Sequence, residues 1–261
     1  MHTTFPAEQE LLKLSVGSAS KGNQFKYISK DKNWYYKGNL FYQNKYWRND
    51  LVEVIASTLS DIGFNCNNTQ VLNQYSVERF GIHGVFSPNF AREGEEFIPF
   101  ERLLHTYNFD ITLNKGLDTF LQIADAYYTL CDIDATDFLL TQALLDFLVG
   151  NEDRHTNNFG ILYKDGEYSL HPCFDFGLGM FEHDRIYEDY KFRDKLSIMQ
   201  FKTFGLNQYS LILELRKRYP DFFTEISKLQ VKPSDFKFPS TDGETYLRNA
   251  CIKLEVSICN D

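Results

Sequence analysis

The stretch GNEDRHTNNFGILYKDGEYSLHPCFDFG, residues 150–177, decides how the rest of the chain is interpreted. A polar loop, NEDRHTNN, follows an apolar run, and two β-type runs then flank Lys164, Asp165 and Gly166. An Asp-Gly turn between two such runs is a strong hairpin signal. We therefore predict a loop and a tight hairpin that returns the chain to Asp175.

The residue types in this stretch suit phosphoryl transfer. That reaction needs a carboxylate to orient the acceptor hydroxyl and take its proton, and metal ions that bridge the phosphates. Such metal ions take hard oxygen ligands. We predict Asp153 as the catalytic base, and Asn158 and Asp175 as metal ligands. Loop Asp and Asn are more often structural, but D-R-H-x-x-N, a hairpin and F-D-F-G together are far more specific.

Two neighbours of Asp153 each admit more than one role from the sequence. His155 is grouped with the cofactor-binding residues. It can carry a proton near neutral pH, although bracing the loop by hydrogen bonds is the more ordinary role. For Arg154, contact with a phosphate and bracing of the loop are equally supported.

The first part of the chain offers a cation for the phosphates. KYIS (26–29) and WYYK (34–37) are β-type runs around a turn, which is a hairpin pattern. Strand alternation places Lys37 on the face opposite Tyr36. Glu53, on a helix expected at residues 47–63, can pair with Lys37. The small-residue loop SVGSASKGN (15–23) allows backbone N–H groups to approach phosphate, so Ser18 joins the cofactor-binding residues.

Hydrophobic periodicity outlines the remaining elements. Residues 69–80 are expected to form two strands with a bend between them. Helices are expected at 117–130, 138–150, 207–219, 221–229 and 242–258. The 138–150 run is apolar almost all round, which predicts deep burial. The fold class is α+β, with a β-rich first lobe over residues 1–80 that contains one helix and a larger helical lobe over 81–261.

Composition narrows the function classes. The net charge is −9, and a general nucleic-acid binder needs a basic surface. The five cysteines are widely spaced and form no CxxC pair, so neither a disulfide framework nor a zinc site is expected. We find neither a signal peptide nor an 18-residue apolar run, so no membrane span is expected. A cytoplasmic protein is expected, or one delivered into a host cell without a classical signal peptide.

Several of these segments resemble the HipA-like kinases. The D-R-H-x-x-N and F-D-F-G pair is the most specific part, and the SVGSAS loop ahead of WYYK is similar too. VERF (77–80) looks like that family's hinge, and residues 84–104 look like the segment after it in compact members, which lack an extra N-terminal subdomain. The resemblance covers about two-thirds of the chain, from residue 14 to residue 179.

This resemblance implies a bilobal protein-kinase-like fold and a serine/threonine protein kinase that uses ATP and Mg²⁺. Lys37 would contact the ATP phosphates, and the backbone of Val77, Glu78 and Arg79 would meet adenine. Ser15 would be a regulatory autophosphorylation site, with Ser18 and Ser20 as nearby alternatives. The implied partners are a protein with a Ser/Thr acceptor and, for a toxin, an antitoxin or regulatory protein. Direct nucleic-acid binding is not expected.

Three other functions share parts of this pattern. Phosphoinositide-type lipid kinases also pair D-R-H-x-x-N with D-F-G, but they favour a basic segment afterwards. Here that segment contains Glu182, Asp184, Glu188 and Asp189. A catalytically inactive pseudokinase that acts as a binding module is the second alternative. An aminoglycoside-type phosphotransferase is weaker, because the order of His and Asp in the loop differs.

Overall fold

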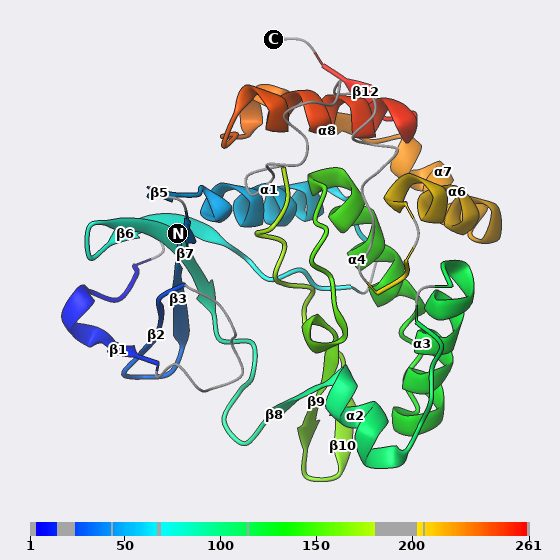
Figure 1. The fold of residues 1–261 in the computed structure, drawn as a ribbon, viewed down its shortest axis with the longest axis horizontal. Coiled ribbons are helices and arrows are strands. Elements are labelled where there is room, and N and C mark those ends of the chain that lie inside the picture. Colours follow the sequence, from blue (N-terminus) through cyan, green and yellow to red (C-terminus); the bar gives the residue numbers. More distant parts are fainter. Residues whose placement is uncertain are drawn as a thin grey trace.

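The computed structural model describes residues 4–14, 24–42, 44–66, 69–113, 115–180, 203–205 and 207–259. An antiparallel sheet, a helical part and a connecting helix make up the fold (Figure 1). In the described ranges, no helix combines the length and the apolar character that crossing a membrane requires.

The first lobe is a five-stranded antiparallel sheet with strand order β1-β2-β3-β7-β6. Its strands are β1 (Leu11–Lys13), β2 (Lys26–Ser29), β3 (Trp34–Gly38), β6 (Tyr75–Arg79) and β7 (Ile82–Pro88). One face carries an aromatic cluster of Tyr36 and Phe86 with Phe5, Trp34 and Tyr75. Because side chains alternate along a strand, Lys37 and its cross-strand partner Val85 lie on the opposite face. A small ribbon, β4 (Phe41–Tyr42) with β5 (Lys45–Tyr46), follows β3.

Helix α1 (Asn49–Ile62) joins the two lobes. It packs against β6 and β7 on one side and against helix α4 on the other. Its apolar residues Val52, Ile55 and Leu59 belong to the main core of the molecule. Gly63 ends the helix in the left-handed region, at φ 116°, as expected for a C-terminal glycine.

The second lobe is built around α4 (Thr136–Val149), of which every residue from Phe138 to Val149 is buried. Helices α1, α6 and α8 surround it, which explains why this helix is apolar almost all round. The other helices are α2 (Phe100–Tyr107), α3 (Leu117–Cys131), α6 (Gln208–Arg218), α7 (Pro220–Ser227) and α8 (Thr241–Lys253). A short parallel pair, β11 (Gln230–Val231) with β12 (Ser257–Ile258), lies near the C-terminus.

The predicted hairpin after the polar loop is present. Strands β9 (Gly160–Lys164) and β10 (Glu167–Ser169) pair across Asp165 and Gly166, which both have positive φ. Strand β8 (Glu96–Pro99), which the sequence did not indicate, completes a three-stranded sheet beside β9. The chain then runs on from β10 to Asp175.

The expected boundary after residue 80 requires a correction. Val77, Glu78 and Arg79 of VERF lie in β6, and Phe80 and Gly81 form a tight turn into β7. β7 sits between β3 and β6 in the first sheet. The boundary therefore falls inside a hairpin, and the first sheet ends at Pro88. Residues 89–95, here called the connector, lead to β8 and the second lobe.

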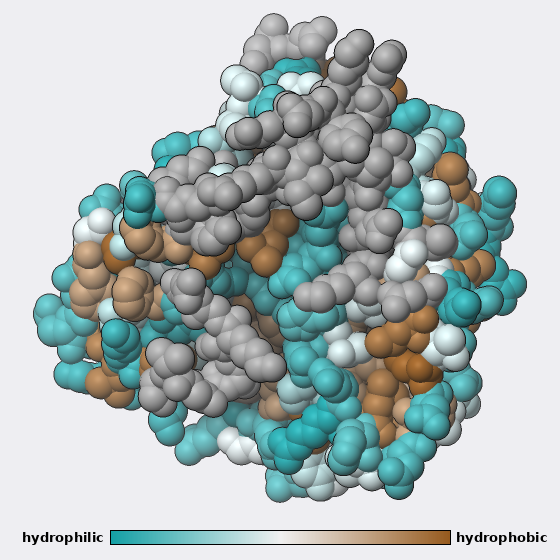
Figure 2. Space-filling view, viewed as in Figure 1, coloured by the Kyte–Doolittle hydropathy of each residue, from teal (hydrophilic) through white to brown (hydrophobic). Residues whose placement is uncertain are grey.

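Apolar side chains gather on the surface over α3 (Figure 2). Leu121 and Tyr128 of that helix are exposed, together with Leu113 before it. Leu121 and Tyr128 are seven residues apart and so share one side of the helix.

Candidate active site

Lys37 is the starting point of the site, because β3 directs it away from the aromatic face. Its neighbour Tyr36 is 1% exposed and donates a hydrogen bond to the carbonyl of Ile82 at 2.6 Å. On the other face, Lys37 Nζ lies 2.6 Å from Asp175 Oδ1 and 3.4 Å from Glu53 Oε1. One lysine thus contacts a helix carboxylate and the carboxylate of F-D-F-G.

Glu53 connects three parts of the chain. It is buried in α1. Its Oε1 contacts Lys37, while its Oε2 accepts a hydrogen bond from the Phe176 backbone N–H at 2.9 Å. A Cβ on Gly177 would stand only 3.0 Å from Glu53 Oε1. The glycine after Phe176 therefore lets the helix carboxylate approach this closely.

Asp175 receives two donors on its carboxylate. Lys37 pairs with Oδ1, and Asn158 Nδ2 donates to Oδ2 at 2.5 Å. Asn158 comes from a short 3-10 helix, Thr156–Asn158, at the end of the polar loop. Asp175 has φ 64°, an uncommon left-handed conformation for a residue other than glycine. Such a conformation costs of order 1–3 kcal/mol and persists where the surroundings hold it in place.

A buried ion pair supplies those surroundings. Arg154 is 0% exposed and binds Asp146 in two places, Nε to Oδ2 at 2.8 Å and Nη2 to Oδ1 at 2.9 Å. It also donates to the carbonyls of Phe174 at 2.8 Å and Asp175 at 3.1 Å. Of the two roles that the sequence left open for Arg154, the structure shows bracing of the loop.

Asp146 and Asn151 were not found from the sequence. Asn151 Nδ2 donates to Asp146 Oδ1 at 2.7 Å and to the Asp175 carbonyl at 3.3 Å. Gln208 of α6 in turn donates to the Asn151 carbonyl at 2.7 Å. A signal was available, because an aspartate inside an otherwise apolar buried helix needs a partner.

Asp153 lies at the exposed side of the loop. Its side chain is 40% exposed, and its backbone N–H donates to Asn151 Oδ1 at 3.3 Å. His155 Nε2 is 4.0 Å from Asp153 Oδ2, and its Nδ1 accepts the Asn157 N–H at 3.3 Å. His155 therefore stabilises the loop locally and stands beside the carboxylate predicted to act as the base.

Lys26 is a second lysine that the sequence did not single out. It is the cross-strand partner of Lys37 in the β2–β3 pair, so both side chains lie on the same face of the sheet. Burial and the nearby Lys37 lower its pKa, while Asp175 and Glu53 act in the opposite direction. Its position could be found only once the strand register was known.

The charges of the cluster stabilise one another. Burial opposes the charged form of Lys37, but Asp175 and Glu53 outweigh it and raise the pKa of this lysine. Burial acts against ionised Asp175 too, yet Lys37 and Arg154 hold the pKa of its carboxyl well below the usual range. Both groups are therefore charged at neutral pH, as an ion-binding site requires.

The expected adenine contacts at Val77, Glu78 and Arg79 do not join this cluster. These residues pair with β7 in the edge strand of the sheet, and β7 separates them from β3. The chain passes between the lobes through the connector instead. Ser15, Ser18 and Ser20 lie outside the described residues, and so do the acidic residues at 182–189.

The sheet with its lysine, the bridging helix and the helical lobe together form a bilobal protein-kinase-like fold. The chain belongs to the HipA-like C-terminal domain family, whose model matches residues 11–220. No curated protein resembles the sequence closely enough to count as a match.

Two solved structures are similar to this chain. The Helicobacter pylori proinflammatory kinase CtkA has a TM-score of 0.58 and 16% identity, and the similarity covers 94% of this chain and 92% of that one. HipA of Shewanella oneidensis, in a toxin–antitoxin complex with HipB and operator DNA, has a TM-score of 0.43 and 15% identity, with 93% of this chain and 64% of that one covered.

Proposed function

We propose that this protein is an ATP-dependent serine/threonine kinase. The observation that carries the proposal is the Asp175 carboxylate, which both the strand lysine Lys37 and the loop amide Asn158 contact. Family membership supports a kinase in general terms. The Ser/Thr acceptor and the use of ATP are the parts that we add.

The residues of the cluster divide the work of phosphoryl transfer. Asp153 accepts the proton of the acceptor hydroxyl. The hydroxyl oxygen attacks the γ-phosphorus of ATP, and the bond from that phosphorus to the ADP oxygen breaks. Lys37 and Lys26 face the same side of the sheet and offer two positive charges to the phosphates. Glu53 keeps Lys37 in place.

The donor set fits Mg²⁺. Asp175 and Asn158 supply a carboxylate and an amide oxygen, which are hard ligands, and Mg²⁺ commonly takes one or two protein ligands with the rest from phosphates and water. Within the described ranges, no group of three or more His, Cys, Asp or Glu side chains is placed to hold a metal ion. When bound, Mg²⁺ would offset the negative charge of the phosphates.

Regulation and partners remain expectations from the family resemblance. They comprise autophosphorylation at Ser15, Ser18 or Ser20 and pairing with an antitoxin or regulatory protein. A phosphate on that loop would add about two negative charges beside the ATP phosphates.

The test is incubation of the purified protein with Mg²⁺ and γ-labelled ATP, beside Asp153→Asn and Asp175→Asn variants. Label on serine or threonine that both variants lose supports the proposal, and phosphopeptide mapping then locates the sites. Label transferred only to phosphatidylinositol vesicles indicates a lipid kinase. Mg-ATP binding without transfer to any acceptor indicates a pseudokinase, and absence of ATP binding overturns the proposal.

A further inference from the structure

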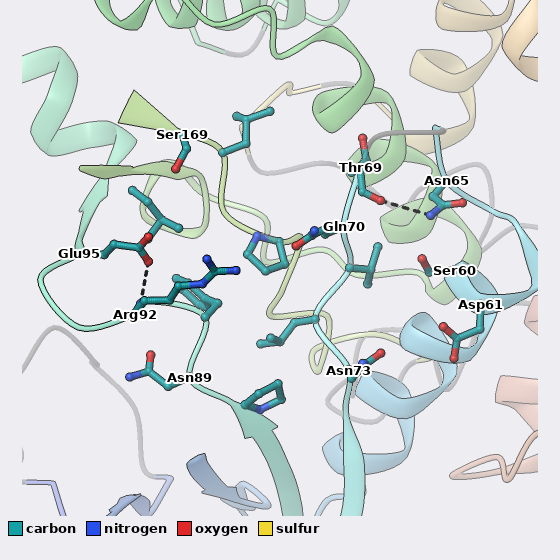
Figure 3. A pocket seen from close by; sticks show the side chains of 17 residues that line it. Ser60, Asp61, Asn65, Thr69, Gln70, Asn73, Asn89, Arg92, Glu95 and Ser169 are labelled. Carbon is teal, nitrogen blue, oxygen red and sulfur yellow. Dashed lines mark hydrogen bonds between the residues drawn. The ribbon is translucent and has the colours of Figure 1, made fainter. Parts of the chain in front are cut away.

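A cavity of about 640 Å³ is lined by residues other than those of the Lys37–Asp175 cluster. Figure 3 shows its lining side chains. None of Lys37, Glu53, Asn158 and Asp175 lines it. Its size is within the range of roughly 300–1,000 Å³ that ligand pockets show. We call it the connector cavity, because Pro88, Asn89, Phe90, Arg92 and Glu95 form one of its walls.

Both lobes contribute to the connector cavity. Ser60 and Asp61 come from the last turn of α1, and residues 69–73 come from the segment between α1 and β6. Leu162 of β9 and Ser169 of β10 come from the second lobe. A ligand in this cavity therefore touches the first lobe, the connector and the second lobe together.

Arg92, Gln70 and Asn73 are exposed polar side chains that line the cavity. Within the part of the chain that the structure describes, Arg92, Gln70 and Asn73 make no side-chain hydrogen bond or ion pair. The Arg92 guanidinium and the Gln70 amide point toward one another from opposite walls (Figure 3). Between the polar groups the lining is apolar, with Val71, Leu72, Pro88, Leu170 and Pro172.

These groups indicate the chemistry of a ligand. A guanidinium matches a carboxylate through two parallel hydrogen bonds. Each side-chain amide offers both donors and an acceptor, as a peptide group does. Asp61 and Glu95 also line the cavity, so a ligand with one negative charge is favoured over a phosphate with two or more.

We propose that the connector cavity binds a short extended peptide segment that carries a carboxylate next to an aliphatic side chain. The carboxylate pairs with Arg92, the peptide groups bond Gln70 and Asn73, and the aliphatic side chain covers the apolar lining. This binding site is separate from the proposed phosphoryl transfer and does not depend on it.

The cavity wall is hydrogen-bonded to the segment that leads to Asp175. Cys173 N–H donates to the Gln70 carbonyl at 2.8 Å, and Leu72 N–H donates to the Cys173 carbonyl at 2.9 Å. Phe90 stacks on Phe174 with ring centroids 5.3 Å apart. A peptide bound to residues 70–73 therefore contacts a segment that is hydrogen-bonded to Cys173, which lies two residues before the proposed metal ligand Asp175.

Peptide pools test the proposal on the intact chain. The first pool holds acetylated, amidated tetrapeptides with glutamate at the third position and every combination of Val, Leu and Ile elsewhere. The second pool has glutamine in place of glutamate. Binding is measured by saturation-transfer NMR. We expect signals from the glutamate pool, at least tenfold weaker signals from the glutamine pool, and a similar loss with Arg92→Gln.

Two controls make the result decisive. Arg218→Gln removes an exposed arginine of α6 outside the cavity, and it is expected to leave binding unchanged. Excess Mg-ATP is expected not to displace the peptides. The proposal is overturned if the glutamate pool gives no signal, if Arg218→Gln weakens binding as much as Arg92→Gln, or if ATP competes with the peptides.

Discussion

Asp175 combines an uncommon backbone conformation with a carboxylate contacted on both oxygens. Its φ is 64°, and Asn151 and Arg154 both donate to its carbonyl. The side chain is thereby directed between Lys37 and Asn158. At this position the backbone hydrogen bonds set the direction of the carboxylate, and the carboxylate sets the positions of its two donors.

Changing Asp175 to Asn keeps the size of the side chain and removes its charge. As Asp175 is the proposed metal ligand, we expect the proposed phosphotransfer to fall by about a thousandfold or more, because several kcal/mol of charge stabilisation at the metal would be lost. The measurement is the initial rate with labelled ATP. Asp165→Asn, in the β9–β10 turn, is the matched control and should keep the rate. A loss of less than tenfold in Asp175→Asn would contradict the assigned role.

His171 predicts a pH dependence of stability. It is buried among Phe90, Phe97, Phe138 and Phe174, and burial lowers its pKa to about 4. Its pKa in the unfolded chain is about 6.5, so protons favour the unfolded state. The stabilisation is complete above about pH 6.5 and is lost as the pH falls toward 4, with a loss of about 2 kcal/mol by pH 5.

The variant His171→Phe should remove that part of the pH dependence. Its free energy of unfolding, measured by urea denaturation, is expected to fall less between pH 7 and pH 5 than that of the wild type, by about 2 kcal/mol. His105→Gln, on the exposed surface of α2, is the control and should behave like the wild type. If the free energy of unfolding falls equally between pH 7 and pH 5 in the wild type and in His171→Phe, protonation of His171 does not destabilise the fold.

At the scale of elements, the end of α4 depends on a close approach by the chain after F-D-F-G. Met180 N–H donates to the Val149 carbonyl at 2.7 Å. A Cβ on Gly179 would lie 2.3 Å from that same carbonyl oxygen. Gly179→Ala therefore has to displace backbone, and we expect a loss of about 1–3 kcal/mol in the free energy of unfolding.

Gly38→Ala is the comparison for that measurement. The nearest atom to its added Cβ is at 3.6 Å, an ordinary contact, so its effect on chemical denaturation should be within about 1 kcal/mol. If both alanine variants unfold at the same urea concentration as the wild type, the segment after F-D-F-G does not pack closely on the end of α4.

The sequence predicted elements well where their signals are local. The helices at α1, α3 and α4 and the hairpin at Asp165 and Gly166 depend on periodicity and turn residues. Residues 69–80 were expected to form two strands, but only Tyr75–Arg79 do. Val71 forms a single bridge with Cys173, a partner about a hundred residues away. Phe80 and Gly81 turn tightly without an Asn-Gly or Asp-Gly signal, which is why β7 was missed.

The site residues also divide into those with a local sequence signal and those that depend on distant partners. Asp153, Asn158 and Asp175 were found because they lie in one short stretch with fixed spacing, and their roles stay predictions. The pairing of Lys37 with Glu53 was expected and is present in the structure. Lys26 and the Asp146–Arg154 pair needed strand register and helix packing, which one sequence does not reveal.

At the scale of the whole molecule, Arg154 connects the core of the second lobe to the site. It joins α4 through Asp146 and the F-D-F-G segment through two carbonyls. Arg154→Met leaves Asp146 with a buried, uncompensated charge. We expect a loss of about 3–5 kcal/mol in the free energy of unfolding, measured by urea denaturation.

An exposed ion pair gives the contrast. Arg102 pairs with Glu96 at 2.8 Å, and both side chains are more than half exposed. Arg102→Met should cost no more than about 1 kcal/mol. The double variant Asp146→Leu with Arg154→Met should recover part of the loss. If Arg154→Met and Arg102→Met lower the free energy of unfolding by similar amounts, the buried Arg154–Asp146 pair does not stabilise the fold as expected.

The contact between Lys37 and Asp175 also bears on the sequence of ligand arrival. A metal ion that approaches Asp175 alone has to compete with an ammonium group 2.6 Å from the same carboxylate. In the proposed kinase, ATP that arrives with its metal would offer Lys37 a phosphate in exchange, so one cation would replace another without leaving a charge unpaired. The protein should therefore load metal and nucleotide as one unit, and free Mg²⁺ in the medium should scarcely occupy it beforehand.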